Sequence, residues 1–152
     1  MNQIADVESI KILKARYCRT IDTKDWAACE QLFTPDFVGS SAGASGEPGP
    51  WDLEIKGGPQ WVANVRKNIG SNNSVHHAIL PEIVLTSSIT ATGIWAAHFG
   101  VRVAGPAAAR FMSGYGHYYD TYAKSGERWL LKSMKLVIQS IDTYSSAETP
   151  AA

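Results

Sequence analysis

The sequence predicts an α+β domain in which three helices from the first half of the chain cover one face of a curved, mixed or antiparallel sheet. Two observations carry this prediction. Apolar residues recur at three- and four-residue steps near the N-terminus, and the chain beyond residue 74 consists of long runs rich in β-branched and aromatic residues. With 152 residues and no internal repeat, the chain can bury one core of its own. We therefore expect a single domain over residues 1–142 and a flexible tail over residues 143–152.

The first helix is expected over residues 6–22. Its apolar face is formed by Ile10, Leu13, Tyr17 and Ile21. The basic residues of this region fall between the apolar positions, and because the total charge is balanced we expect them to form a solvated helix face. They are Lys11, Lys14, Arg19 and Lys24.

Two further helices are expected before the sheet. A short helix covers residues 26–33 and ends ahead of Pro35, because the residue before a proline is biased away from helical geometry. A third covers residues 59–69, with a proline at its first turn and Gly70 after its last residue.

Four long strands are expected in the second half, over residues 75–85, 90–103, 110–123 and 129–141. Short turns separate them, which predicts an antiparallel meander. A strongly curved sheet of this kind with helices across its mouth has the shape of a cone. Short strands are also expected at Phe37–Val38 and at residues 52–56. The Gly- and Pro-rich residues 39–50 between them are expected to form a mobile loop.

Charge and composition exclude several classes of function. Fourteen basic residues balance fourteen acidic ones, so the excess of positive charge typical of proteins that bind nucleic acids or anionic membranes is missing. Acidic residues near the N-terminus and the lack of a long apolar run argue against an export signal or a membrane span. We expect Cys18 and Cys29 to be two reduced thiols in a cytoplasmic protein.

Several spaced motifs resemble the SnoaL-like branch of the nuclear transport factor two-like superfamily over about residues 5–140. They are Tyr17-x4-Asp22, the segment from Asp25-Trp26 to Leu32-Phe33-x-x-Asp36, His76-x4-Pro81-x-Ile83, and Tyr118-x-Asp120-x-Tyr122 before Trp129. The resemblance implies a cone-shaped fold with an apolar cavity between the sheet and the helices. Members of the superfamily include polyketide cyclases, dehydratases, a dehydrochlorinase and ketosteroid isomerase.

The same resemblance implies a catalytic set of His76, Asp22 and Tyr17. A neutral imidazole removes protons well near neutral pH, and a carboxylate on its second nitrogen fixes the tautomer. Tyr17 is the expected hydrogen-bond donor to the oxygen that leaves or enolises. Three alternatives stay open: Asp22 as the cap of the second helix, Tyr17 as a core residue, and His76 as a structural histidine. Because neighbouring strand residues point to opposite faces, only one of His76 and His77 can face the cavity.

The walls of the substrate cavity are expected from strand alternation and from positions in the family. Met134 stands where the dehydrochlorinase has an arginine, so that cationic contact is in doubt. Packing in the core is an equally good interpretation of the whole set. The predicted wall residues are Trp51, Trp61, Trp95, Phe99, Tyr118, Met134, Leu136 and Ile138.

Together these observations predict a cofactor-independent lyase that acts on a small hydrophobic, cyclic substrate. Cyclisation or isomerisation would start with the same proton abstraction, and a non-catalytic binding or assembly module is the alternative from another class. The spacing of the histidines and carboxylates matches no metal-ligand pattern, so no metal is expected. A broad sheet leaves an outer face to cover, and the dehydratase-like relatives favour a homotrimer over a dimer.

Overall fold

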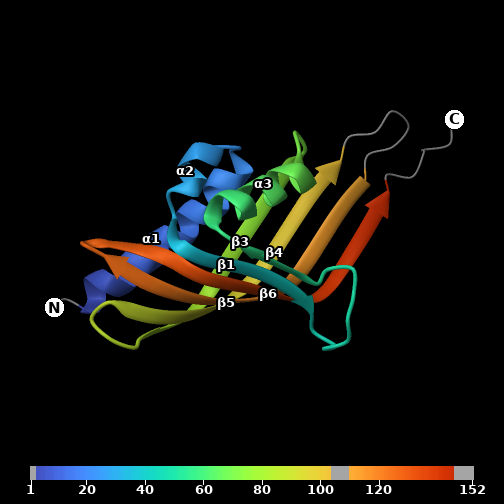
Figure 1. The fold of residues 1–152 in the computed structure, drawn as a ribbon. Helices are drawn as coiled ribbons and strands as arrows, with labels where there is room; N and C mark the ends of the chain where they lie inside the picture. Colours follow the sequence, from blue (N-terminus) through green and yellow to red (C-terminus); the bar gives the residue numbers. More distant parts are fainter. Residues whose placement is uncertain (1–2, 104–109, 146–152) are drawn as a thin grey trace, which may run out of the picture.

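The computed structural model describes residues 3–103 and 110–145, and Figure 1 shows their arrangement. Three helices lie together on one side of the sheet, and the far ends of β4, β5 and β6 run past them. In chain order the elements are α1 (Gln3–Asp22), α2 (Trp26–Glu30), β1 (Phe33–Gly43), β2 (Leu53–Lys56), α3 (Gly58–Ile69), β3 (Asn73–Leu85), β4 (Thr90–Val103), β5 (Arg110–Ser125) and β6 (Arg128–Ser145).

The six strands form one curved, unclosed sheet in the order β2-β1-β6-β5-β4-β3. The predicted meander is present, because β3, β4, β5 and β6 pair antiparallel in sequence. The sheet is mixed, because β1 pairs parallel to β6. The α+β class and the cone-like arrangement are therefore confirmed.

The structure corrects the prediction around β1. The second helix ends at Glu30 rather than at residue 33, and Phe33 already pairs with Leu131 of β6. Residues 39–43 of the predicted loop also belong to β1 and pair with β6. The cause is a pairing between segments far apart in sequence, which overrides the local preferences of both.

Residues 143–145, which were expected to belong to the tail, are part of the last strand instead. β6 continues to Ser145, and residues 143–145 pair with residues 110–112 of β5. The predicted strand therefore ends four residues too early. Of the expected flexible tail, residues 146–152 lie outside the part that the structure describes.

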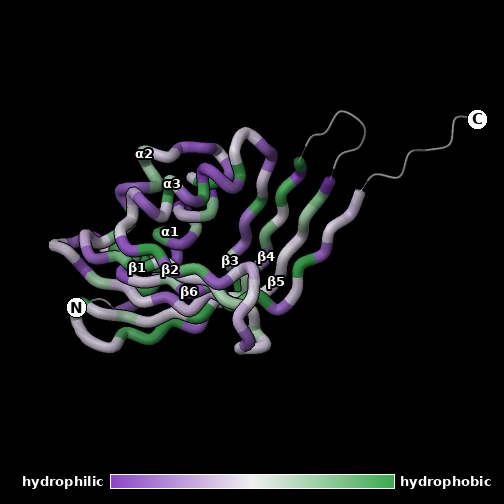
Figure 2. The backbone as a smooth tube through the Cα atoms, turned by 45° about the vertical axis from the view of Figure 1, so that its right-hand side comes forward, coloured by the Kyte–Doolittle hydropathy of each residue, from purple (hydrophilic) through white to green (hydrophobic). Residues whose placement is uncertain are grey.

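The core lies between α1, α3 and the inner face of the sheet. Each residue of the predicted apolar face of α1, Ile10, Leu13, Tyr17 and Ile21, is buried. Burial alternates along β4 and β5, and hydropathy alternates along the strands in Figure 2. Burying a large apolar side chain contributes about 1.5–3 kcal/mol, so this inner face supplies much of the stability. Cys18 and Cys29 are free thiols within this core.

Lys14 overturns part of the prediction for the basic face of α1. Arg19 is exposed and Lys11 is partly exposed, as expected. The Lys14 side chain, in contrast, is completely buried and forms an ion pair with Asp120 of β5, with a distance of 2.8 Å between Nζ and Oδ2. A partner 106 positions away makes this burial possible, and no local pattern reveals such a partner.

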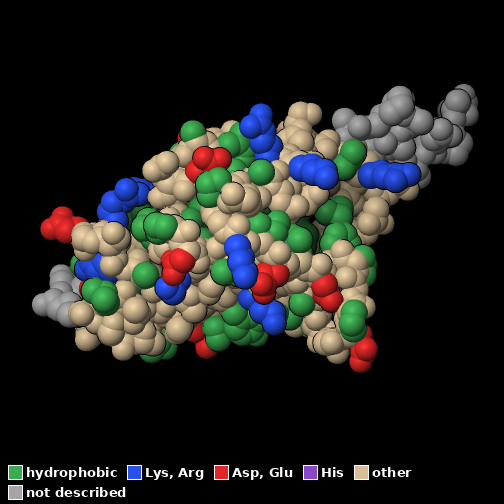
Figure 3. Space-filling model, in the orientation of Figure 1, with side chains coloured by type: hydrophobic (Ala, Val, Ile, Leu, Met, Phe, Trp, Pro, Cys, Tyr) green, Lys and Arg blue, Asp and Glu red, His purple; other side chains and the backbone are tan. Residues whose placement is uncertain are grey.

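The visible surface carries mixed charge. Figure 3 shows acidic and basic side chains interspersed on the face it presents, as the balanced composition implies. Within the described residues, no helix is both long and apolar enough to span a membrane.

The close contact between β1 and α3 gives a first prediction. A Cβ atom on Gly39 would lie 2.3 Å from the Trp61 ring, so Gly39→Ala must displace that ring. We expect a loss of about 1–3 kcal/mol in the free energy of unfolding, measured by chemical denaturation. Gly43→Ala in the same strand is the matched control, because its Cβ would meet only Ser45 Oγ at 3.8 Å. Equal losses in both variants would contradict the close-contact explanation.

Candidate active site

Asp22 joins the end of α1 to the edge strand β3. Its Oδ2 accepts a hydrogen bond from the backbone N–H of His76 at 2.8 Å, and its Oδ1 accepts one from Ser74 Oγ at 3.0 Å. The same Oδ1 lies 2.7 Å from Nδ1 of the His76 ring. The structure therefore brings together two of the predicted site residues, which are 54 positions apart in the chain.

These contacts determine the charge on Asp22. Burial opposes ionisation, but hydrogen bonds from the ring and backbone of His76 and from Ser74 outweigh it and lower the pKa of Asp22. An ionised carboxylate only accepts hydrogen bonds, so His76 Nδ1 carries the proton and Nε2 is left as the basic nitrogen. Asp22 does not cap α2, because Asp25 does so by accepting from the backbone N–H of Ala28.

His76 and His77 point to opposite faces of the sheet, as alternation predicts. His76 stacks with Phe99 on the inner face, with ring centroids 6.3 Å apart. His77 is exposed, and its Nδ1 lies 3.2 Å from Nδ1 of His98. Among the described residues, Nε2 of His76 has no hydrogen-bond partner. A basic nitrogen is therefore free to act on a ligand.

A groove between α1 and β3 reaches this pair of side chains. It has a volume of about 400 Å³, and both Asp22 and His76 line it. Its other polar lining residues are Arg19, Thr23 and His77, and the rest are small or aliphatic: Ala15, Cys18, Val75, Ala78 and Ile79. A small hydrophobic molecule can thus reach His76 from this side of the domain.

Tyr17 is both a core residue and an available donor. It is 3% exposed and packs edge-to-face against Phe33. Its hydroxyl accepts a hydrogen bond from Trp61 Nε1 at 3.1 Å, and no described residue accepts the phenolic proton. Burial, aided by the nearby Tyr118, raises the pKa of Tyr17 well above its usual value, so the phenol stays protonated. Tyr17 is not among the residues that line the groove.

A profile of the SnoaL-like domain matches residues 2–135. The chain belongs to this family. A curated relative from Gibberella zeae, named as a probable cyclase, is 21% identical over 126 residues, which are 81% of this chain and 84% of that protein.

Solved structures show the same fold. One, named as a candidate scytalone dehydratase from Novosphingobium aromaticivorans, has a TM-score of 0.77 at 19% identity and covers 99% of this chain and 97% of its own. Another, a hexachlorocyclohexane dehydrochlorinase from Novosphingobium barchaimii, has a TM-score of 0.71 at 13% identity, with 93% and 92% covered. The curated relative is thus named for a cyclase reaction, and the two solved structures of the same fold are named for a dehydratase and a dehydrochlorinase.

The predicted wall residues of the SnoaL-like domain fall into two groups. Seven lie on the inner face of the sheet or on α3 facing it, and most of them are buried: Trp61, Trp95, Phe99, Tyr118, Met134, Leu136 and Ile138. Trp51 does not join them. It is 43% exposed in the turn before β2, where its backbone carbonyl accepts a hydrogen bond from Ser41.

The burial of three polar residues, Lys14, Asp120 and Tyr122, was not predicted. Asp120 Oδ2 accepts hydrogen bonds from Lys14 and from the Tyr122 hydroxyl, and Tyr122 in turn accepts from Trp95 Nε1 at 2.8 Å. Burial raises the pKa of Asp120, while Lys14 and Tyr122 oppose the rise. Strand alternation offered a signal, because Asp120 has the same parity as the inward-facing Tyr118, and a carboxylate on a core face requires a partner.

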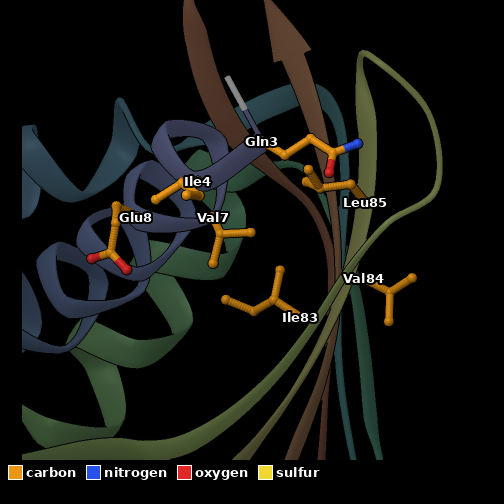
Figure 4. Close-up of a pocket in the computed structure, with 7 residues that line it drawn as sticks. All are labelled: Gln3, Ile4, Val7, Glu8, Ile83, Val84 and Leu85. Atoms are coloured by element: carbon orange, nitrogen blue, oxygen red, sulfur yellow. The ribbon is translucent and has the colours of Figure 1, made fainter. Parts of the chain in front are cut away.

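A second hollow, of about 470 Å³, lies between the start of α1 and the end of β3. Figure 4 shows Ile83 directed toward α1 and Val84 directed away from it. The hollow is lined by Gln3, Ile4, Val7, Glu8, Ile83, Val84 and Leu85. Its only ionisable side chain is Glu8, which is exposed and paired with Lys11, so the groove at His76 is the better candidate for chemistry. Within residues 3–103 and 110–145, no cluster of three or more His, Cys, Asp and Glu side chains could hold a metal.

The lowered pKa of Asp22 gives the second prediction, a pH-dependent contribution to stability. A carboxylate whose pKa is lower in the folded state stabilises the fold above its ordinary pKa of 3.8, and that contribution is lost as the pH falls through the folded value. We expect Asp22→Asn to lower the free energy of unfolding by about 1–3 kcal/mol at pH 7. Denaturation at a series of pH values should show the difference shrinking below pH 4.

Asp25→Asn is the control for this experiment. Asn caps helices about as well as Asp, so this variant should stay close to the wild type across the series. A gap between wild type and Asp22→Asn that is constant from neutral to acidic pH would contradict the assigned role of the charge.

Proposed function

We propose that this SnoaL-like domain is a cofactor-independent lyase for a small hydrophobic, cyclic substrate. The observation that carries the proposal is the 2.7 Å contact between Asp22 and His76, which leaves Nε2 as the free basic nitrogen beside a groove. An oriented imidazole of this kind suits proton abstraction from carbon. Relatives named as a dehydratase and a dehydrochlorinase support an elimination reaction.

The elimination of water illustrates the steps. Nε2 of His76 takes a proton from the carbon next to the substrate carbonyl, and the C–H electron pair forms an enolate. The enolate returns to the carbonyl while the bond to the leaving hydroxyl breaks, which creates the carbon–carbon double bond. The imidazolium then gives its proton to the departing oxygen, so water leaves and His76 is neutral again. Asp22 keeps the ring in one tautomer and stabilises the imidazolium.

We assign to Tyr17 the hydrogen bond to the substrate oxygen that gains charge, which requires that oxygen to reach beyond the groove wall, since Tyr17 is 3% exposed and does not line the groove. Its hydroxyl already accepts from Trp61, so the phenolic proton is the group left to donate. General-base catalysis accounts for about 10²- to 10⁴-fold in rate. The apolar walls and this donor must provide the remaining acceleration, because electrostatic stabilisation is strongest where water is excluded.

Cyclisation or isomerisation is the second candidate, supported by the relative named as a probable cyclase. Both begin with the same proton abstraction and differ in the fate of the enolate. A test of the shared first step therefore covers all three reactions. A binding module without chemistry would show no such step.

The third prediction concerns this shared step. The protein is incubated in D₂O with a panel of cyclic ketones, and exchange of the protons beside the carbonyl is measured by proton NMR. The wild type should accelerate this exchange. His76→Gln should lower the enzymatic exchange rate by about 10²- to 10⁴-fold, because it removes the basic nitrogen. New alkene signals would then identify substrates that also eliminate.

His117→Gln is the matched control, since this histidine of β5 is not among the residues that line the groove. It should retain the exchange rate. The mechanism is wrong if His76→Gln exchanges as fast as the wild type, and a domain that binds ketones without any exchange favours the binding module.

A further inference from the structure

The outer face of the sheet carries a pair of histidines that the proposed mechanism does not use. His77 of β3 and His98 of β4 lie directly opposite each other in the register of the two strands. Their Nδ1 atoms are 3.2 Å apart, and their ring centroids are 5.5 Å apart. His98 is not among the residues that line the groove at His76. The two facing ring nitrogens are therefore an arrangement separate from the catalytic pair.

The ring of His98 is held by two residues of β5. Its Nε2 lies 3.2 Å from Oγ of Ser113, a residue that is 3% exposed. Its ring stacks on that of Tyr115, with centroids 5.0 Å apart and an angle of 26° between the planes. His77, in contrast, is exposed. One imidazole of the pair is thus fixed in place, while the other is free to adjust to a ligand.

The separation of the two nitrogens suits a shared metal ion. Imidazole nitrogens bind Zn²⁺ at about 2.0–2.1 Å, so two of them on one tetrahedral ion lie about 3.3 Å apart. The 3.2 Å between the Nδ1 atoms of His77 and His98 is close to this value. A small rotation of the exposed His77 ring is enough to direct both lone pairs at one ion.

The contact with Ser113 supports the same interpretation. A histidine that binds a metal almost always donates its other ring N–H to a fixed acceptor, which sets the tautomer. Ser113 Oγ is placed to accept from Nε2 of His98, which leaves Nδ1 unprotonated and facing His77. A serine hydroxyl can also donate a hydrogen bond. Ser113 can therefore support the metal-free pair as well, in which His98 Nδ1 donates a proton to His77.

We propose that His77 and His98 form a two-histidine site for a transition-metal ion such as Cu²⁺ or Zn²⁺. Imidazole suits these ions, whereas Mg²⁺ and Ca²⁺ prefer oxygen ligands. Within the described part of the chain no third His, Cys, Asp or Glu joins the pair, so water fills the remaining coordination positions. Spacing along the sequence did not reveal the site, because its ligands are 21 positions apart on neighbouring strands.

An ion at this site joins the edge strand to the rest of the sheet. β3 has β4 as its one neighbouring strand, and the register between them shifts between Ile79 and Glu82. Leu80, within that shift, has a positive φ of 51°. A metal bridge from His77 to His98 restrains the strand that also carries His76. Because such an ion binds the folded state, it also stabilises the domain.

The fourth prediction is selective binding of Cu²⁺ and Zn²⁺ by the full chain. Kd values are measured by competition with a chromophoric metal indicator. Cu²⁺ should bind more tightly than Zn²⁺, and Mg²⁺ should not compete. Ser113→Ala removes the partner of Nε2 but neither ligand, so it should weaken Cu²⁺ binding by about tenfold. His98→Gln removes a ligand and should weaken it by about 100-fold.

Two further measurements report the geometry of the site. Electron paramagnetic resonance of bound Cu²⁺ should show coupling to two imidazole nitrogens in the wild type and to fewer in His98→Gln. Zn²⁺ should raise the denaturation midpoint of the wild type but not that of His98→Gln. His117→Gln is the matched control, because it removes a histidine of β5 that is not part of the pair. It should bind Cu²⁺ as the wild type does.

The inference is overturned if the wild type binds Cu²⁺ no more tightly than His98→Gln, or if the bound ion couples to fewer than two nitrogens. Equal losses in His117→Gln and His98→Gln would also overturn it, because they would indicate adventitious binding to scattered histidines. The role of His76 is judged separately, by proton exchange in metal-free buffer, so either proposal can fail without the other.

Discussion

The contact between Asp22 and β3 is the interaction on which the rest of the arrangement depends. One carboxylate accepts hydrogen bonds from the backbone of His76, from the His76 ring and from Ser74. The last turn of α1 is thereby attached to the edge strand of the sheet. The same atoms select the tautomer of His76. The Asp22 carboxylate therefore fixes both the position of the helix layer and the choice of Nε2 as the unprotonated nitrogen. An uncharged replacement of Asp22 should affect both.

The interior of this SnoaL-like domain is more polar than an apolar cavity between helices and sheet implies. Lys14, Asp120 and Tyr122 form a hydrogen-bonded chain that ends at Trp95. The hydroxyl and indole donors of that chain each have an acceptor, which is what makes buried polar groups tolerable, and of the described residues' atoms in the chain Asp120 Oδ1 is the one left without a partner. Tyr17 follows the same arrangement as Tyr122, because each hydroxyl accepts from a tryptophan. The difference is that Tyr122 donates to Asp120, whereas Tyr17 has no acceptor among residues 3–103 and 110–145.

Most of the fold could be predicted from local patterns, and part of the site from the resemblance to the family. The apolar spacing in α1 and the four runs of strand residues were confirmed, since each depends on neighbours within a few positions. Where prediction failed, distant contacts decided. β1 starts at Phe33 because β6 pairs with it, and Lys14 is buried because Asp120 receives it. Trp51 lies apart from the inner face because its turn precedes the outermost strand, β2.

By itself, the sequence determined the periodicity of each segment and the α+β class, and its resemblance to the SnoaL-like family implied the pair of His76 and Asp22. Those features follow from side-chain direction along a helix or strand and from motif spacing. Only the tertiary structure decided which alternative applies to each polar residue: Asp25 rather than Asp22 caps α2, and Lys14 is a core cation rather than a solvated one. The reason is physical. Burial of a charge is stable only beside a partner, and that partner comes from a strand more than 100 positions away.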